Sequence, residues 1–199
     1  LALDNADVPH LAFAQQRAAD PTRYAMVLKR LNGATWELAA PVVPIDGQRP
    51  QDISAGALAF DGSNRAVLVF SDANLGALRA LRLEQGLLIP MAPPTIPTAA
   101  FTTMSLQADG TPIVAYLNIN GWLTAAALRN GTWQSLGFID TIPNSTQGII
   151  SARIVLRGAE PWVVWSKFFQ EGGVRLNVAR YDGAQWVAQP FDTPVIEEG

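Results

Sequence analysis

The sequence predicts an all-β fold made of four copies of a four-stranded antiparallel sheet, and three observations support this prediction. First, four apolar segments recur with a period of about 50 residues, namely VPHLAF, RAVLVF, TPIVAY and EPWVVW. Second, a strand-turn-strand signature follows three of these segments and ends in Trp36, Trp133 and Trp186, while the second copy keeps the frame and has Leu88 in place of tryptophan. Third, Asp-Gly and Asn-Gly pairs separate the short β-type runs, and such pairs are the strongest hairpin signal.

The third repeat shows its four strands most plainly. The runs FTTMSLQA, TPIVAYLNI, WLTAAALR and TWQSLG are separated by the pairs Asp109-Gly110, Asn120-Gly121 and Asn130-Gly131. Residues of these types tolerate the positive φ that tight hairpin turns require. Each repeat is therefore expected to form one antiparallel meander.

A four-stranded meander repeated along the chain is typical of a β-propeller, in which each repeat is a blade. We expect residues 1–199 to form a single propeller region with blades at about 1–56, 57–104, 105–152 and 153–190. The proline-rich stretches 41–50 and 91–98 are interpreted as crossings between blades, because proline blocks extension of a sheet edge. The tail 191–199 resembles another crossing. We therefore expect either a part of a longer propeller, with further blades elsewhere, or a homodimer that closes the ring.

Two segments have the composition of helices. Residues 75–86 place leucines three apart, and residues 13–20 are rich in helix formers. Both align with β-rich segments of the other repeats, and tertiary context overrides such local preferences. The strand interpretation is therefore favoured.

The ends of two strand pairs resemble a known repeat. Gly33 to Trp36 and Gly183 to Trp186 are similar to the end of the Asp-box of sialidase-like propellers, S-x-D-x-G-x-x-W, although Leu31 and Tyr181 stand at its Asp position. All four repeats also resemble bacterial secreted propeller repeats of the form G-x-P-x-V-A-Y…V-x-R-x-D-G-x-x-W. The resemblance implies a propeller fold; within it the Asp-box is structural and lies away from the ligand face, so it implies no catalytic activity.

Composition excludes several functions. The chain has 14 basic and 17 acidic residues and no basic cluster, so nucleic acid is not expected as a partner. It has no cysteine and one histidine, which excludes thiolate chemistry and argues against a metal site of clustered imidazoles. No apolar run approaches the roughly 18 residues that would span a membrane. We expect no metal, no cofactor and no catalytic residues.

The residues that suggest catalysis have structural explanations. His10 aligns with Val67 and Ile113, at a position that packs. Asp61 and Asp109 could form a carboxylate pair for acid-base chemistry, but both precede glycine in hairpin turns, where aspartate is favoured for local hydrogen bonding.

Three arginines invite comparison with the carboxylate-binding arginines of sialidase-like enzymes. Arg30, Arg82 and Arg180 occupy equivalent third-strand positions. Equivalent positions on successive blades point around the ring, so we interpret these arginines as exposed strand charges that discourage edge pairing.

The expected binding surface is the set of turns between the second and third strands of each repeat, at 15–23, 71–75, 118–122 and 166–173. Loops on a rigid scaffold usually carry binding. The candidate binding residues are the aromatic Trp122 and Phe168 and the polar Asn118, Asn120, Arg17, Arg23 and Lys167.

Two functions follow from this surface. The favoured one is a non-enzymatic binding or protein-interaction module of an extracellular or cell-surface protein, with a glycan or protein ligand on the loop face. The alternative is a glycosidase-like or lyase-like enzyme that is completed by missing blades. For the enzyme, Asp20, Asp72 and Glu171 are the carboxylates available in these turns.

Overall fold

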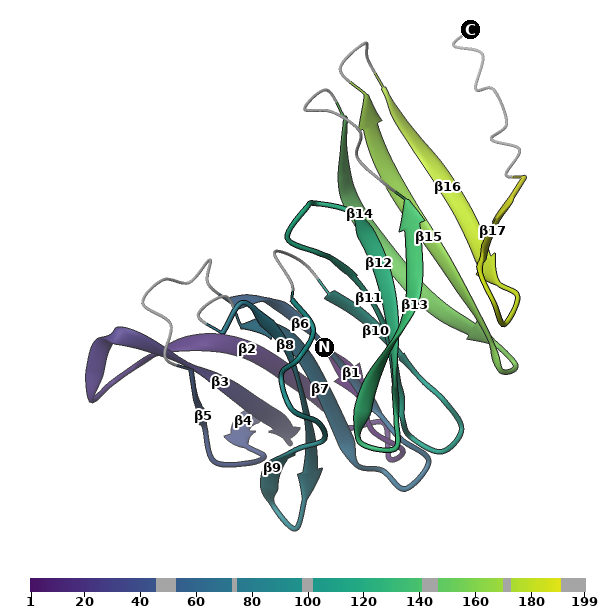
Figure 1. Cartoon of the computed structure of the whole chain (residues 1–199). Helices are drawn as coiled ribbons and strands as arrows, with labels where there is room; N and C mark the ends of the chain where they lie inside the picture. Colours follow the sequence, from purple (N-terminus) through teal and green to yellow (C-terminus); the bar gives the residue numbers. More distant parts are fainter. Residues whose placement is uncertain (46–52, 73–74, 98–101, 141–146, 170–172, 191–199) are drawn as a thin grey trace, which may run out of the picture.

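The computed structural model describes residues 1–45, 53–72, 75–97, 102–140, 147–169 and 173–190, and every regular element in these ranges is a β-strand (Figure 1). The first sheet contains β1 (Ala2–Leu3), β2 (Pro9–Arg17), β3 (Asp20–Asn32), β4 (Thr35–Leu38) and β5 (Val43–Ile45). The second contains β6 (Ile53–Phe60), β7 (Ala66–Asp72), β8 (Ala77–Glu84) and β9 (Leu87–Pro90). The third contains β10 (Thr102–Leu106), β11 (Pro112–Leu117), β12 (Leu123–Arg129) and β13 (Thr132–Asp140). The fourth contains β14 (Gln147–Arg157), β15 (Glu160–Phe169), β16 (Val174–Tyr181) and β17 (Trp186–Gln189).

Each sheet is an antiparallel meander in chain order, and β5 pairs with β3 beside the first meander. The all-β prediction is confirmed. The segments 13–20 and 75–86, which have helical composition, contribute to β2, β3 and β8. The predicted divisions after residues 56, 104 and 152 fall inside β6, β10 and β14, and the predicted tail 191–199 lies outside the described residues. No helix in the described ranges is long and apolar enough to cross a membrane.

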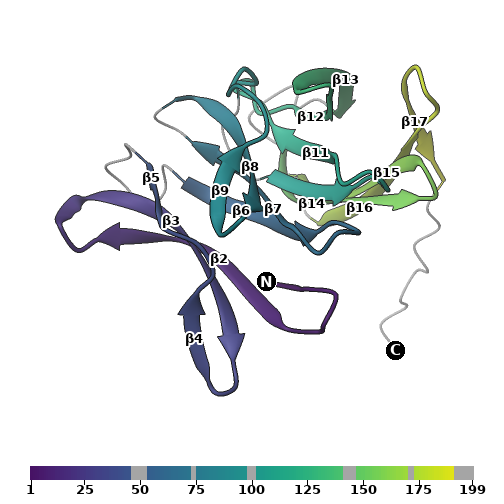
Figure 2. The same ribbon diagram turned by 90° about the horizontal axis from the view of Figure 1, so that it is seen from below.

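The four sheets follow one another in chain order like the leaves of a fan (Figures 1 and 2). Neighbouring sheets contact each other through their first strands, since β10 contacts both β6 and β14. The sheets are thus arranged as successive propeller blades, with their first strands side by side.

The second strand of each inner sheet packs against both neighbouring sheets. In β7, Leu68 and Phe70 belong to the core shared with the first sheet, whereas Val67 and Val69 belong to the core shared with the third. Alternate side chains of a strand point to opposite faces, so a strand covered on both faces is apolar throughout. This two-sided burial explains the uninterrupted apolar runs of the second and third repeats.

A five-residue turn recurs at 4–8, 61–65 and 118–122. In each, the side-chain oxygen of the first residue, Asp4, Asp61 or Asn118, accepts hydrogen bonds from the backbone N–H groups of the third and fifth residues at 2.9–3.1 Å. The fourth residue has a positive φ in all three turns, which Asp, Asn and Gly tolerate better than other residues. The side chains named as possible catalysts or ligands at these positions therefore stabilise turns.

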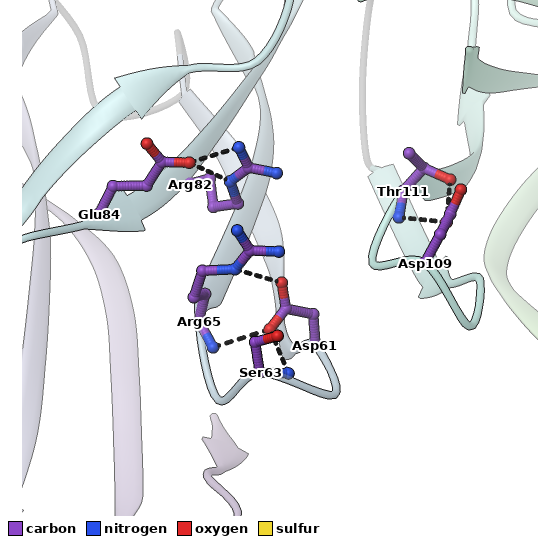
Figure 3. A network of polar contacts seen from close by, with 7 residues as sticks. All are labelled: Asp61, Ser63, Arg65, Arg82, Glu84, Asp109 and Thr111. Carbon is purple, nitrogen blue, oxygen red and sulfur yellow. Dashed lines mark hydrogen bonds and ion pairs between the residues drawn. The ribbon is translucent and has the colours of Figure 1, made fainter. Parts of the chain in front are cut away.

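Asp61 is bonded within its own turn, as Figure 3 shows, and it lies close to the next sheet. Its Oδ2 accepts a hydrogen bond from Nε of Arg65 at 2.8 Å. Gly110 of the next turn lies so close that a Cβ there would be 2.8 Å from the Asp61 Cβ. In that turn Asp109 accepts hydrogen bonds from the N–H and hydroxyl of Thr111. Asp61 and Asp109 are thus held by their own turns, as the sequence predicts.

The three repeated tryptophans differ in how deeply they are buried. Trp133 is 8% exposed in the core between the second and third sheets, and Trp186 packs against the core between the third and fourth. Trp36 is 40% exposed, and all four residues of β4 are exposed. Trp36 therefore does not fill a packed position equivalent to that of Trp133.

We predict that Trp133→Ala lowers the free energy of unfolding by about 3–5 kcal/mol, because it removes a large buried ring. Trp36→Ala is expected to cost about 1 kcal/mol or less, as for an exposed position. Urea unfolding at equal protein concentration measures both. Equal losses would contradict the packing of the outer strands described above.

Asp61→Ala is expected to destabilise the protein by about 1–3 kcal/mol at pH 7, because the N–H groups of Ser63 and Arg65 lose their acceptor. Burial, the largest single effect, raises the pKa of Asp61, but hydrogen bonds from Arg65 and Ser63 together hold it below the ordinary 3.8. The charged carboxylate therefore stabilises the fold above that value, and this stabilisation is lost as the pH falls through the folded pKa.

The control is Asp61→Asn, which keeps the side-chain oxygen, as Asn118 does in its own turn. Its loss should be smaller than that of the alanine variant. Unfolding curves between pH 7 and pH 3 should show the difference between wild type and Asp61→Asn shrinking toward low pH. A difference independent of pH would show that the charge of Asp61 contributes nothing.

Candidate functional site

The structure shortens most of the turns on the expected binding surface. β2 and β3 are joined by residues 18–19 alone, so Arg17 lies in β2 and Arg23 in β3. β15 continues to Phe169, which places Lys167 and Phe168 in that strand. Asn118, Asn120 and Trp122 do lie in a turn, as expected. The side chain of Arg23 and all of Glu171 are outside the described part of the chain.

Trp122 packs on a neighbouring strand. Its ring meets Phe138 of β13 edge to face, with ring centroids 5.0 Å apart and an interplanar angle of 87°. Phe138 is 55% exposed, so the pair presents an aromatic surface beside the turn 118–122. Phe138 was missed because the sequence run was expected to end at Gly137, whereas β13 continues to Asp140.

Lys167 is held by an ion pair between two sheets. Its Nζ lies 3.0 Å from Oδ1 of Asp140, and Nε1 of Trp165 donates to the other oxygen of the same carboxylate at 2.9 Å. Lys167 and Asp140 are both largely buried. This triad fixes the fourth sheet to the third, so the Lys167 side chain has a structural partner.

The remaining predicted residues are dispersed. Phe168 is 44% exposed on the fourth sheet. Arg17 lines a separate pocket of about 350 Å³ on the first sheet, with Gln15 and Val42. The structure therefore brings Asn118, Asn120 and Trp122 together and leaves the other candidates on different sheets.

The carboxylate and imidazole candidates for catalysis have structural partners. Asp72 is buried and paired with Nη1 of Arg79 at 3.3 Å. Asp20 begins β3, where its backbone lies opposite that of Arg17 in β2. His10 is buried, with Nε2 3.3 Å from Oδ2 of Asp4 and its ring 4.6 Å from that of Phe60. The structural interpretation of His10 is confirmed.

The three equivalent arginines do not converge on one point. Arg30, Arg82 and Arg180 lie opposite the same position of the second strand in their sheets. Each pairs with a carboxylate of its own sheet, namely Glu37, Glu84 and Glu160. The three arginines are therefore paired strand residues, and their role in discouraging edge pairing stays a prediction.

A pocket that the sequence did not predict lies between the third and fourth sheets, at the end opposite the turn 118–122. Its volume is about 370 Å³. Apolar walls come from Ile113, Leu136 and Tyr181, and polar groups come from Gln107, Arg129 and Glu160. These residues come from two repeats and from six different strands or turns, so no local pattern in the sequence brings them together.

The polar groups of this pocket are fixed in different ways. The Glu160 carboxylate accepts a hydrogen bond from Trp162 Nε1 at 2.8 Å and another from Arg180 Nη1 at 2.9 Å. These two hydrogen bonds, of which the one from Trp162 has the larger effect, hold the pKa of Glu160 below its ordinary value. The carboxylate is therefore charged at neutral pH. Arg129 is exposed and forms no ion pair with any residue that the structure describes. Tyr181 is packed against Trp186, with ring centroids 5.4 Å apart.

This arrangement combines a charged acceptor, a charged donor and an apolar wall with an aromatic ring. Such pockets hold small ligands by burying an apolar face and fixing a few polar groups. Within the described ranges, no group of three or more His, Asp or Glu side chains could hold a metal ion.

Comparison with known proteins finds no matching family model and no matching curated protein. Among solved structures, the chain is similar to Aleuria aurantia lectin in complex with alpha-methyl-L-fucoside, with 13% identity over 96% of this chain and 63% of the lectin, and a TM-score of 0.53. It is similar to AofleA from Arthrobotrys oligospora, with 12% identity over 94% of this chain and 57% of that one, and a TM-score of 0.53.

A third similar structure is the GH43_1 enzyme from Xanthomonas citri complexed with xylose, with 12% identity, coverage of 89% of this chain and 67% of the enzyme, and a TM-score of 0.51. The chain thus spans less than two thirds of the length of Aleuria aurantia lectin and of AofleA. Identities this low show the fold alone. Together, the similarity to these solved structures and the four antiparallel meanders show that the chain has the β-propeller fold of four-stranded blades.

Proposed function

We propose that the chain is a glycan-binding β-propeller module, and that the saccharide occupies the pocket between the third and fourth sheets. The observation that carries this proposal is the position of Glu160 and Arg129 beside the ring of Tyr181 in one pocket. A sugar presents hydroxyl groups on its edges and C–H groups on its faces. It therefore needs charge-assisted hydrogen bonds and an apolar wall at the same time.

Preorganisation strengthens the proposal. Glu160 is already oriented by Trp162 and Arg180, and Tyr181 by its packing on Trp186. A ligand that meets groups already in place loses less free energy to the ordering of side chains. The pocket is also large enough for a monosaccharide unit at about 370 Å³.

The ligands of similar structures support sugar as the ligand class. Aleuria aurantia lectin was solved with alpha-methyl-L-fucoside and the Xanthomonas citri enzyme with xylose. A sugar-binding propeller is consistent with the expected extracellular or cell-surface location. A protein ligand, a homodimer and further blades remain predictions.

The hydrogen bonds and ion pair of the pocket's two carboxylates, Glu160 and Asp182, favour binding over hydrolysis. Glycosidases use two carboxyl groups that flank the scissile bond, one as acid and one as base or nucleophile. In the pocket, Glu160 is paired with Arg180, and Asp182 accepts hydrogen bonds from Ala184 and Gln185 in its own turn. The hydrogen bonds from Gln185 and Ala184 also hold the pKa of Asp182 below its ordinary value, which disfavours a role as an acid.

Arg129→Ala and Glu160→Gln are expected to weaken glycan binding about tenfold or more, which corresponds to about 1.4 kcal/mol. Arg129 is exposed, so the fold should survive its removal. Titration calorimetry with alpha-methyl-L-fucoside and with xylose measures the affinity, after a glycan array has ranked longer saccharides. Lys29→Ala, which removes a cation from the first sheet, is the matched control and should bind as wild type does.

Trp122→Ala distinguishes the pocket from the surface expected from the sequence. Wild-type affinity in this variant supports the pocket. Binding lost in Trp122→Ala and retained in Arg129→Ala would place the ligand on the turn 118–122 and contradict the proposal. Saturable turnover of fluorogenic glycosides would instead favour the enzyme.

A further inference from the structure

The first strands of the last three sheets, β6, β10 and β14, surround another pocket, which we call the axial pocket. Its volume is about 370 Å³. It is lined by Gly56 and Ala57 of β6, Thr102 of β10 and residues 150–153 of β14. The N–H of Ile154 in β14 lies 3.5 Å from the hydroxyl of Thr103 in β10. The pocket is therefore bounded by three strands that are fixed to one another.

Irregularities in two strands shape this pocket. The pairing of β6 with β7 shifts between Ser54 and Ala57, and the pairing of β14 with β15 shifts between Ile149 and Ser151. Such bulges redirect side chains and are frequent beside functional sites. At Gly56 a Cβ would lie 2.6 Å from the carbonyl oxygen of Val69, so only glycine fits where the strand bulges.

The wall of the pocket carries an unsatisfied hydroxyl. Thr102 is 6% exposed, and its Oγ1 has no hydrogen-bond partner among the residues that the structure describes. Buried hydroxyl groups are normally hydrogen-bonded. By contrast, the hydroxyl of Ser151 is paired with that of Ser166 at 2.9 Å. Thr102 thus has a free donor and acceptor beside the pocket.

Arg153 gives the pocket a positive charge. It is exposed and forms no ion pair within the described ranges, whereas Arg79 and Arg180 are each paired with a carboxylate. Among the described residues that line the pocket there is no aspartate or glutamate. A guanidinium binds a carboxylate through two parallel hydrogen bonds, which gives both energy and orientation.

We propose that this axial pocket binds a carboxylate-bearing monosaccharide, a hexuronate, whose carboxylate pairs with Arg153 and one of whose hydroxyls bonds to Thr102. The three features that point to this class are the unpaired guanidinium, the unsatisfied buried hydroxyl and a volume that accommodates one sugar ring. The site is separate from the pocket between the third and fourth sheets, and the inference does not rest on the proposed function of that pocket.

Titration calorimetry of the whole chain with D-glucuronate and D-galacturonate, and with D-glucose and D-galactose as neutral counterparts, tests this assignment. At least one hexuronate should bind saturably with one site per chain. The corresponding neutral sugar should bind about tenfold more weakly or not at all, since it cannot form the charge-assisted pair.

Three variants locate the site. Arg153→Ala should lower hexuronate affinity about tenfold or more, and Arg153→Lys should lower it less, because lysine keeps the charge and loses the two-pronged geometry. Thr102→Val, which is nearly isosteric, should lower affinity several-fold with an unchanged unfolding temperature. Arg129→Ala changes the other pocket and should leave hexuronate affinity unchanged.

The assignment is overturned by any of four results: no saturable hexuronate binding, equal affinity for the neutral sugar, unchanged affinity in Arg153→Ala, or affinity lost in Arg129→Ala and retained in Arg153→Ala. The fucoside and xylose titrations of Arg129→Ala report on the inter-sheet pocket alone. Failure of one site is therefore distinguishable from failure of the other.

Discussion

The fold depends on the burial of the second strand of each inner sheet between two neighbouring sheets. In β11, Ile113 and Ala115 pack toward the fourth sheet, and Val114 and Tyr116 pack toward the second. Each apolar side chain on such a strand removes surface from water on one face or the other, at about 25 cal/mol per Å². Because the same strand serves both interfaces, a change in its position alters two interfaces at once. This coupling fixes the sheets relative to one another without any disulfide, since the chain has no cysteine.

Both candidate sites arise from the way in which these sheets stack. The inter-sheet pocket is bounded by Ile113 and Leu136 on one sheet and by Tyr181 on the next, and all three belong to or pack against the same apolar core. The axial pocket lies where β6, β10 and β14 meet. In both places, rigid strands position the polar groups, which is the arrangement that limits the loss of conformational freedom on binding.

Local sequence signals predicted the fold well because a propeller blade is a local structure. The turns at Asp61, Asp109 and Asn118 form as their residue types indicate. The lengths of the strands were less predictable. For example, β15 continues through Lys167 and Phe168. The sequence did not predict this, because polar and aromatic side chains at a strand end do not reveal whether pairing continues. The exposure of Trp36 depends on the surroundings of β4, which its own repeat does not encode.

The sites were much harder to predict than the fold. Arg129, Glu160 and Tyr181 are distant in sequence: Arg129 ends β12, Glu160 begins β15 and Tyr181 ends β16. Only the stacking of two sheets makes them neighbours. Arg153 carried no sequence signal either, because an arginine without an ion pair is indistinguishable from a paired one until its neighbours are known.

Hydrogen–deuterium exchange of the chain, with and without the best saccharide from a glycan array, distinguishes the inter-sheet pocket from the turn 118–122 as the binding site. We predict slower exchange on ligand addition in peptides that cover 126–132 and 157–162, which border the inter-sheet pocket, and unchanged exchange in peptides that cover 118–122. Slower exchange confined to 118–122 would contradict binding in the pocket and would place the binding surface on the turn that holds Trp122.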